Sequence, residues 1–191
     1  MRAFIGVGSS IDPERNILRG LELLLYTERI LKISNFYQNQ AVSRPKDPTF
    51  WNGVVAIETS CTPRDLKYYV LRRVESECGR TRDSDSYSPR TLDLDILVYG
   101  NKVIREKGMV IPDPDIRSRP FIALPLYETE PLMILPDTGE LLSDILRNMD
   151  VSGLKFLQNF SNEVQKRFPV SQKGISTANE TFQHHKRGIF S

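Results

Sequence analysis

The chain has 191 residues, and its 26 Lys and Arg against 24 Asp and Glu give a formal net charge of +2. This near balance argues against a nucleic-acid binder, and the length allows one domain with a good core but not two full domains. Its 2 cysteines, Cys61 and Cys78, suggest no disulfide framework. The opening apolar run is too short for a signal peptide, and no segment reaches membrane-spanning length. We therefore expect a cytoplasmic protein without membrane partners, and the oligomeric state stays open.

The first 60 residues alternate strand patterns with one helical pattern. Residues 3–7 predict a buried strand that ends at the small-residue turn Gly8-Ser9-Ser10. Asp12 and Pro13 predict the cap and first turn of a helix that continues to residue 25. Residues 30–37 and 54–59 predict two more strands. Between them, residues 39–49 are rich in Pro and charged residues, which predicts a loop that shapes a pocket wall.

A second helix is predicted from Thr62 to Cys78, because Thr62 and Pro63 form a strong helix start. Helical spacing places several residues on one shared face, among them Leu66, Tyr69, Val70 and Val74. Glu75 falls outside this face, so it need not be buried. The following residues 80–89 are polar, and a loop of this kind could close over a substrate.

Residues 88–100 combine a strand pattern with two acids and a guanidinium. As a strand, this run places Asp93 and Asp95 on one face, with Cα atoms roughly 6.5 to 7 Å apart, and puts four apolar residues on the other, namely Leu92, Leu94, Ile96 and Val98. Two such carboxylates suit Mg²⁺, and the guanidinium of Arg90 could bind a phosphate through two parallel hydrogen bonds. A solvated strand face is the alternative, but two acids at neighbouring positions of one face repel each other, which favours the metal site.

The second half of the chain predicts shorter elements. Gly100-Asn101 predicts a two-residue hairpin turn into an edge strand at residues 102–104, and residues 111–114 predict a kinked extended segment. A short helix at residues 122–127 interrupted at Pro125, a strand at 132–135 and a helix at 141–149 follow. The order of elements predicts an α+β fold with a ferredoxin-like β-α-β-β-α-β core, an added hairpin and C-terminal helices. We assign residues 1–160 to this domain and residues 161–191 to a polar tail.

From about residue 3 to residue 146 the chain resembles the 6-hydroxymethyl-7,8-dihydropterin pyrophosphokinases of folate biosynthesis. The most specific match is the run from Ser88 to Leu97, which resembles the family signature of Pro-Arg, two residues, then Asp-apolar-Asp. Supporting matches are Gly8-Ser9, Phe36-Tyr37, Asn52-Gly53, Gly79-Arg80, Ile111-Pro112 and Arg119-Pro120-Phe121. The resemblance implies transfer of a pyrophosphoryl group from ATP to the pterin hydroxymethyl group, with AMP as the product.

The resemblance also implies roles for individual residues. Asp93 and Asp95 would hold two Mg²⁺ ions on the ATP phosphates, and Arg80 and Arg90 would lie against the triphosphate. These four are the implied catalytic residues. The ATP site would further contain Glu75, Arg82, Ile96 and Arg119. The pterin site would contain Val42, Asn52, Tyr87 and Phe121.

Several positions depart from the family pattern. Asp113 stands where many bacterial members have His, and Ser86 and Gly108 stand where Arg occurs in others. Tyr87 replaces a frequent Trp, and Asn39-Gln40 replaces Thr-Pro. These departures predict that the activity is present but that ATP binds more weakly than in members with the full set. Residues that could compensate are Arg105, Lys107 and Arg117.

Two other functions fit parts of the pattern. A weakened or silent pterin- or nucleotide-binding homologue could keep the fold, but it has no reason to keep the repulsive pair Asp93 and Asp95. A Mg²⁺-dependent nucleotidyltransferase would also use Gly-Ser followed by Asp-apolar-Asp. In those enzymes the two motifs are separated by about ten residues, whereas a helix, two strands and a second helix intervene here.

Overall fold

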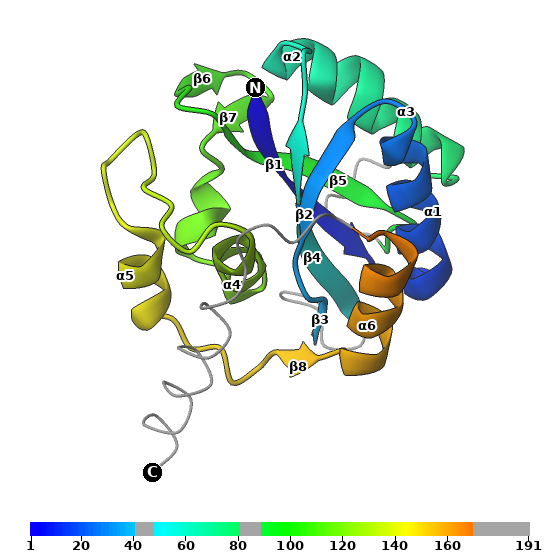
Figure 1. The fold of residues 1–191 in the computed structure, drawn as a ribbon. Coiled ribbons are helices and arrows are strands. Elements are labelled where there is room, and N and C mark those ends of the chain that lie inside the picture. Colours follow the sequence, from blue (N-terminus) through cyan, green and yellow to red (C-terminus); the bar gives the residue numbers. More distant parts are fainter. Residues whose placement is uncertain (41–47, 81–88, 170–191) are drawn as a thin grey trace.

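The computed structural model describes residues 1–40, 48–80 and 89–169. Its core is a 6-stranded sheet (Figure 1) made of β1 (Arg2–Ser9), β2 (Arg29–Ile33), β3 (Tyr37–Asn39), β4 (Phe50–Glu58), β5 (Asp93–Tyr99) and β8 (Lys155–Phe156). β1 lies between β4 and β5 and is antiparallel to both. β2 and β3 both pair with β4, and β8 pairs with β3. This arrangement confirms the predicted α+β fold with a ferredoxin-like core.

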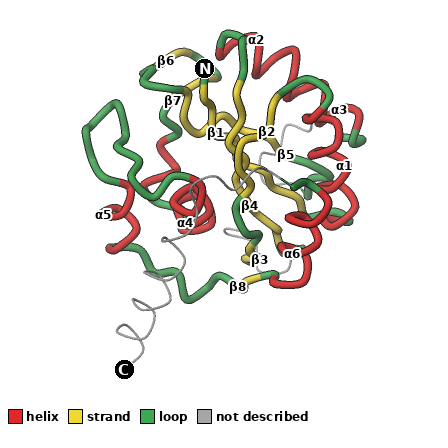
Figure 2. The backbone as a smooth tube through the Cα atoms, in the orientation of Figure 1, coloured by secondary structure: helices red, strands yellow, loops and turns green. Residues whose placement is uncertain are grey.

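Helices cover both faces of the sheet (Figures 1 and 2). One face packs against α1 (Pro13–Leu25), the continuous helix formed by α2 (Pro63–Asp65), η1 (Leu66–Leu71) and α3 (Arg72–Glu77), and α6 (Gln158–Arg167). The other face packs against η2 (Pro114–Arg117), α4 (Pro120–Thr129) and α5 (Leu142–Arg147). No helix in the three described ranges is both long and apolar enough to cross a membrane.

The predicted strand over residues 30–37 is in fact two strands, β2 and β3, separated by a break at Ser34. The Ser34 hydroxyl accepts a hydrogen bond from Val54 N at 2.8 Å, while Ser34 N donates to Val54 O at 2.9 Å. A side chain that bonds the neighbouring backbone competes with the regular ladder of a sheet. The edge strand is therefore interrupted here, and β3 follows its own course along β4.

The helix from residue 63 to residue 77 begins as predicted, since the Thr62 side chain accepts a hydrogen bond from Asp65 N at 3.1 Å. The face assignment was wrong, because η1 is a π-helix, in which hydrogen bonds span five residues. Leu66 and Leu71 are therefore both buried, Tyr69 is 73% exposed, and Glu75 is only 3% exposed. The change of helical repeat turns Glu75 inward.

Helix α1 also differs from its prediction at the first residue. Pro13 lies in the first turn, but within the described part of the chain the Asp12 side chain makes no capping hydrogen bond. Asp12 has a left-handed backbone with φ 42°, and its carboxylate lies 3.8 Å from Arg15. The helix thus starts at the expected place without the expected cap.

Three predictions in the second half were wrong in detail. The hairpin joins β6 (Ile104–Glu106) to β7 (Met109–Ile111), so its turn lies at Gly108 and not at Gly100-Asn101. Pro125 lies inside α4 without interrupting it, because the hydrogen bonds from Ala123 N to Arg119 O and from Glu130 N to Leu126 O remain on either side. In place of a strand at 132–135, Ile134 forms an isolated bridge with Leu141.

Helix α6 runs across the expected domain boundary at residue 160. Phe160, Val164 and Phe168 are buried in the same cluster as the sheet and α1. Arg167 also forms an ion pair with Glu22 of α1. The packed part of the chain therefore extends through Phe168, and residues 170–191 lie outside the described ranges.

Candidate active site

A pocket of about 320 Å³ opens between strands β1, β3, β4 and β5 and the start of α4. It brings together predicted site residues from three separate parts of the chain, namely Asn52, Arg90, Asp93, Asp95, Arg119 and Phe121. The pocket therefore contains both the acids expected to bind metal and two of the residues expected to bind the pterin.

Two glycines of β1 form the floor of the pocket. Gly8 pairs with Asp93 on one side and with Asn52 on the other, and Gly6 pairs with Asp95 on one side. A Cβ at Gly8 would lie 3.0 Å from Asn52 Oδ1 and 3.9 Å from Asp93 Cβ. Glycine at this position thus leaves open the space between the acid on β5 and the amide on β4.

The alternation predicted for β5 holds up to Ile96 and then fails. Leu94 and Ile96 face the α1 side of the sheet, whereas Asp93 and Asp95 line the pocket on the other face. Phe4 and Ile5 of β1 pair with Val98 and Ile96, so Leu97 is an extra, bulged residue of β5, and Leu97 and Val98 both pack on the pocket side. The Ile96 side chain lies in the core, and only its main chain could contact a nucleotide.

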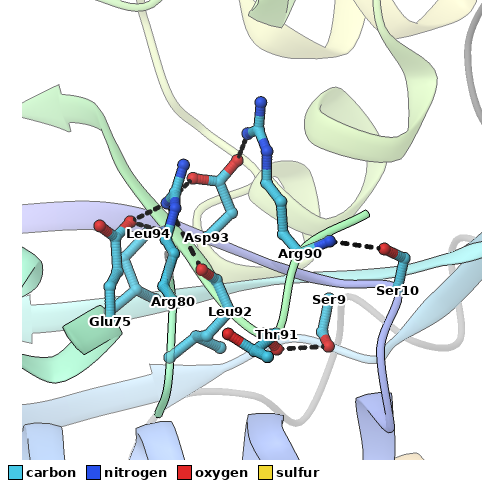
Figure 3. A network of polar contacts seen from close by, with 9 residues as sticks. All are labelled: Ser9, Ser10, Glu75, Arg80, Arg90, Thr91, Leu92, Asp93 and Leu94. Atoms are coloured by element: carbon cyan, nitrogen blue, oxygen red, sulfur yellow. Dashed lines mark hydrogen bonds and ion pairs between the residues drawn. The ribbon is translucent and has the colours of Figure 1, made fainter. Parts of the chain in front are cut away.

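Two guanidinium groups bind Asp93 from opposite sides (Figure 3). Arg80 forms ion pairs with Glu75 and with one oxygen of Asp93, and Arg90 pairs with the other oxygen. Glu75 Oε1 also accepts a hydrogen bond from Leu94 N at 2.9 Å, which fixes the buried carboxylate to β5. Burial lowers the pKa of Arg80, but the negative charges of Asp93 and Glu75 outweigh this and leave it raised. Positive charge is therefore held beside Asp93.

The turn after β1 holds the segment that carries Arg90 (Figure 3). Arg90 N donates to Ser10 Oγ at 2.9 Å, and Ser10 N donates to Arg90 O at 2.9 Å. Ser9 Oγ donates to Thr91 O at 2.6 Å. The Gly-Ser-Ser turn thus anchors the start of the Asp-Leu-Asp strand.

The donor set of Asp93 and Asp95 fits Mg²⁺ that is completed by water and substrate. Among the described residues, no group of three or more His, Cys, Asp or Glu is placed to hold a metal ion. Mg²⁺ is usually held by one or two carboxylates together with substrate phosphates. The Asp95 carboxylate is exposed inside the pocket, where restricted solvation and then the charge of Asp93 raise its pKa. A cation would relieve that repulsion.

The opposite wall contains Asp113, Asp115 and Arg119. Asp113 N donates to Leu97 O at 2.8 Å, which ties this wall to β5. Its carboxylate accepts from Asp115 N at 2.8 Å, and Asp115 pairs with Arg119 at 2.8 Å. Burial raises the pKa of Asp113 to about 6, with a contribution from the charge of Asp95. The Arg119 guanidinium lies 5.7 Å from the centre of the Phe121 ring.

Other predicted residues do not all lie at the pocket. Val42, Arg82, Ser86 and Tyr87 fall outside the described residues. Arg117 was expected to be able to compensate for missing nucleotide contacts, but its guanidinium forms ion pairs with Asp137 and Glu140, both at 2.8 Å. These contacts hold Arg117 against the loop that precedes α5.

The pocket also contains residues that sequence reasoning did not select. Phe50 and Asn39 line it beside Asn52, and Asp115 lines it beside Asp113. Phe50 precedes Asn52 by two residues on one strand, so the period-two rule could have identified it. Asn39 comes from another strand, and the sequence marked it only as a departure from the family pattern, not as a site residue.

A family model described as "7,8-dihydro-6-hydroxymethylpterin-pyrophosphokinase (HPPK)" matches residues 4–131. The chain belongs to this family. The match includes every described pocket residue and ends two residues after α4. Helices α5 and α6 and strand β8 therefore lie beyond the matched segment.

Curated relatives agree with this assignment. A 2-amino-4-hydroxy-6-hydroxymethyldihydropteridine pyrophosphokinase of Synechocystis is 31% identical over 155 residues, which cover 80% of this chain and 78% of the relative. The protein of the same name from Haemophilus influenzae is 32% identical over 76% of this chain and 91% of its own length. That from Aquifex aeolicus is 36% identical over 70% of this chain and 82% of its own.

A solved structure titled as an HPPK-DHPS in complex with substrates is similar in fold. Its TM-score is 0.56 at 13% sequence identity, and the match covers 88% of this chain. This chain spans only 45% of that longer chain. The likeness therefore supports the HPPK fold and nothing further.

Proposed function

We propose that this protein transfers a pyrophosphoryl group from ATP to the hydroxymethyl group of 6-hydroxymethyl-7,8-dihydropterin and releases AMP, a step of folate biosynthesis. The observation that carries the proposal is the row Asp93, Gly8 and Asn52 across three adjacent strands of an HPPK-family chain. Neighbouring strands lie about 4.8 Å apart, so the Cα atoms of the acid and the amide are roughly 10 Å apart. A pterin held at Asn52 would thus direct its hydroxymethyl group toward phosphates held near Asp93.

The acidic end of the pocket suits the phosphates. Asp93 and Asp95 would hold Mg²⁺, and we propose two ions, which would neutralise the phosphate oxygens and align them for in-line attack. Arg90 lines the pocket beside them, and Arg80 is anchored by Glu75 next to Asp93. Transfer of this kind depends on positioning and charge neutralisation more than on covalent chemistry. The side chains of this end supply both.

The other end suits a flat heterocycle. Asn52 offers an amide that can both donate and accept, and the rings of Phe50 and Phe121 line the same space. Aromatic side chains stack on flat rings, while an amide reads the polar edge of such a ring. We propose that Arg119, beside Phe121, contributes to the ATP site.

We further propose that ATP binds more weakly than in family members with the full set of basic residues. Asp113 lines the pocket, and an ionised carboxylate there would repel a phosphate. Gly108 has φ 83° at the β6–β7 turn, a conformation that favours glycine over arginine. Side-by-side titration with a non-hydrolysable ATP analogue tests this, and equal or tighter binding than in such a member contradicts it.

The deciding experiment is to incubate the protein with ATP, Mg²⁺ and the hydroxymethyl-dihydropterin and to identify the nucleotide product. AMP that forms only when the pterin is present supports pyrophosphoryl transfer. ADP would indicate a simple kinase, and free pyrophosphate a nucleotidyltransferase. Pterin binding without any product would indicate a silent homologue, the second candidate, which the departures at Asp113 and Gly108 favour.

The proposed partners are the two small substrates. We also propose a cytoplasmic location, because Cys61 and Cys78 are free thiols, as is usual in reducing compartments. Cell fractionation with an antibody to the protein tests the location, and recovery outside the cytoplasmic fraction contradicts it.

A further inference from the structure

Asn39, at the end of β3, lies beside Asn52 on the same face of the sheet. β3 pairs with β4 so that Asn39 is opposite Phe50, and Asn52 is two residues further along β4. This diagonal arrangement brings the two side chains within reach of each other. Asn52 Nδ2 donates a hydrogen bond to Asn39 Oδ1 at 2.6 Å, and both residues line the pocket.

A backbone carbonyl determines which way both amides point. An asparagine side chain can exchange its oxygen and nitrogen by rotating half a turn, so its hydrogen-bond partners decide the orientation. Asn39 Nδ2 donates to Gln40 O at 2.8 Å, and a carbonyl oxygen can only accept. The oxygen of Asn39 must therefore face Asn52, and Asn52 must meet it with its nitrogen.

The remaining polar atoms of Asn52 then have a fixed order. Its Oδ1 points toward the floor of the pocket, where a Cβ at Gly8 would lie 3.0 Å away. Among the described residues, Asn39 uses one of the two Nδ2 hydrogens, which leaves the second for a ligand. Asn52 thus presents one acceptor and one donor in a defined arrangement.

We propose that Asn39 is a positioning residue, which sets the order of acceptor and donor that Asn52 presents to the pterin ring. A 2-amino-4-oxo ring carries N–H groups and a carbonyl oxygen side by side on one edge, and an amide of fixed orientation pairs with only one order of these. The proposal rests on the proposed function, since it requires that the pterin meets Asn52. Its consequence is that Asn39 acts on pterin affinity through Asn52 and not by itself.

The test uses calorimetry to measure the binding of hydroxymethyl-dihydropterin. The full chain is compared with Asn39→Ala, Asn52→Ala and the double variant. Loss of one directed hydrogen bond is expected to weaken pterin binding of Asn39→Ala by about fivefold to tenfold, with ATP-analogue affinity unchanged. The double variant should bind no more weakly than Asn52→Ala, because residues that act through one another are not additive. Asn39→Asp keeps an acceptor toward Asn52 but loses the donor to Gln40 O, so its pterin affinity should lie between those of the native chain and Asn39→Ala.

Gln38→Ala is the matched control. Gln38 precedes Asn39 on β3, and its side chain donates to Thr49 Oγ1 at 2.8 Å, so the variant also removes one hydrogen bond from this strand. If Gln38→Ala weakens pterin binding as much as Asn39→Ala does, the effect is general loosening of β3 and the inference is overturned. Additive losses in the double variant, or unchanged binding by Asn39→Ala when Asn52→Ala is impaired, also overturn it and leave the proposed function intact. Unchanged binding by Asn52→Ala refutes the pterin site of the proposed function itself.

Discussion

The acidic end of the pocket and its amide end are built in different ways. At the acidic end, Arg90, Asp93 and Asp95 come from six consecutive residues, and Asp93 is already paired with Arg90 and with Arg80, which Glu75 also holds. At the amide end, neutral groups from separate elements meet, and a backbone carbonyl orients them. For phosphates to bind at the acidic end, the guanidinium groups of Arg80 and Arg90 would have to turn from Asp93 toward the phosphates. A ring bound at the amide end would instead meet polar groups whose orientation is already set.

This difference predicts that the two ends control different steps. Charge at the acidic end should govern turnover, because it acts on the phosphates during transfer. The amide end should govern the affinity for the pterin. The following changes test that separation, in order of decreasing expected effect.

Asp95→Asn should have the largest effect. Removing this charge is expected to lower the rate of pterin-dependent AMP formation by about 10²- to 10³-fold, because the metal-binding oxygens lose their negative charge. Pterin affinity should stay within about twofold, since Asn52 lies on another strand. Rate assays and pterin titrations measure the two quantities. Glu106→Gln, which removes an equal charge from the exposed strand β6, is the control and should leave both unchanged.

Gly8→Ala should affect the amide end more than the acidic end. The added Cβ would lie 3.0 Å from Asn52 Oδ1 but 3.9 Å from Asp93 Cβ, so Asn52 has to move. We expect pterin binding to weaken by roughly tenfold, because overpacking of this kind costs about 1 to 3 kcal/mol. Gly153→Ala is the control, since among the described residues nothing lies within 4 Å of its added Cβ. A fall in turnover of Gly8→Ala with unchanged pterin affinity would contradict the assignment of pterin affinity to the amide end.

Asp113→Asn should have the smallest effect and should depend on pH. Burial raises the pKa of Asp113 to about 6, so the folded protein holds this proton more tightly than the unfolded chain does. The resulting stabilisation is complete below pH 4 and is lost as the pH rises through 6. The free energy of unfolding of the variant should therefore exceed that of the native chain by about 1 kcal/mol at pH 7.5, a value that allows for solvent screening. At pH 4 the two free energies should be equal. Urea titrations at both pH values measure this, and a gain that is the same at both would contradict it.

Much of the fold followed from local patterns. The order of strands and helices, the start of the second helix at Thr62 and the shared face of Asp93 and Asp95 were all predictable. Each depends on a repeat or a cap that spans only a few residues. The face of Glu75 was not, because a π-helical stretch changes the repeat between Leu66 and Leu71. Helix α6 was not predicted either, since its polar sequence contains only two buried hydrophobic residues, Phe160 and Val164, with Phe168 buried just after its end.

The sequence by itself determined the two acids of the acidic end, because Asp93 and Asp95 alternate on strand β5 and Arg90 lies only three residues before Asp93. Only the tertiary structure decided the amide end. It placed Gly8 between Asp93 and Asn52, broke the edge strand at Ser34, and brought Asn39 against Asn52. Pairing between strands depends on register, which no short segment contains. The orientation of Asn52 depends in turn on a carbonyl, that of Gln40, at the end of a different strand.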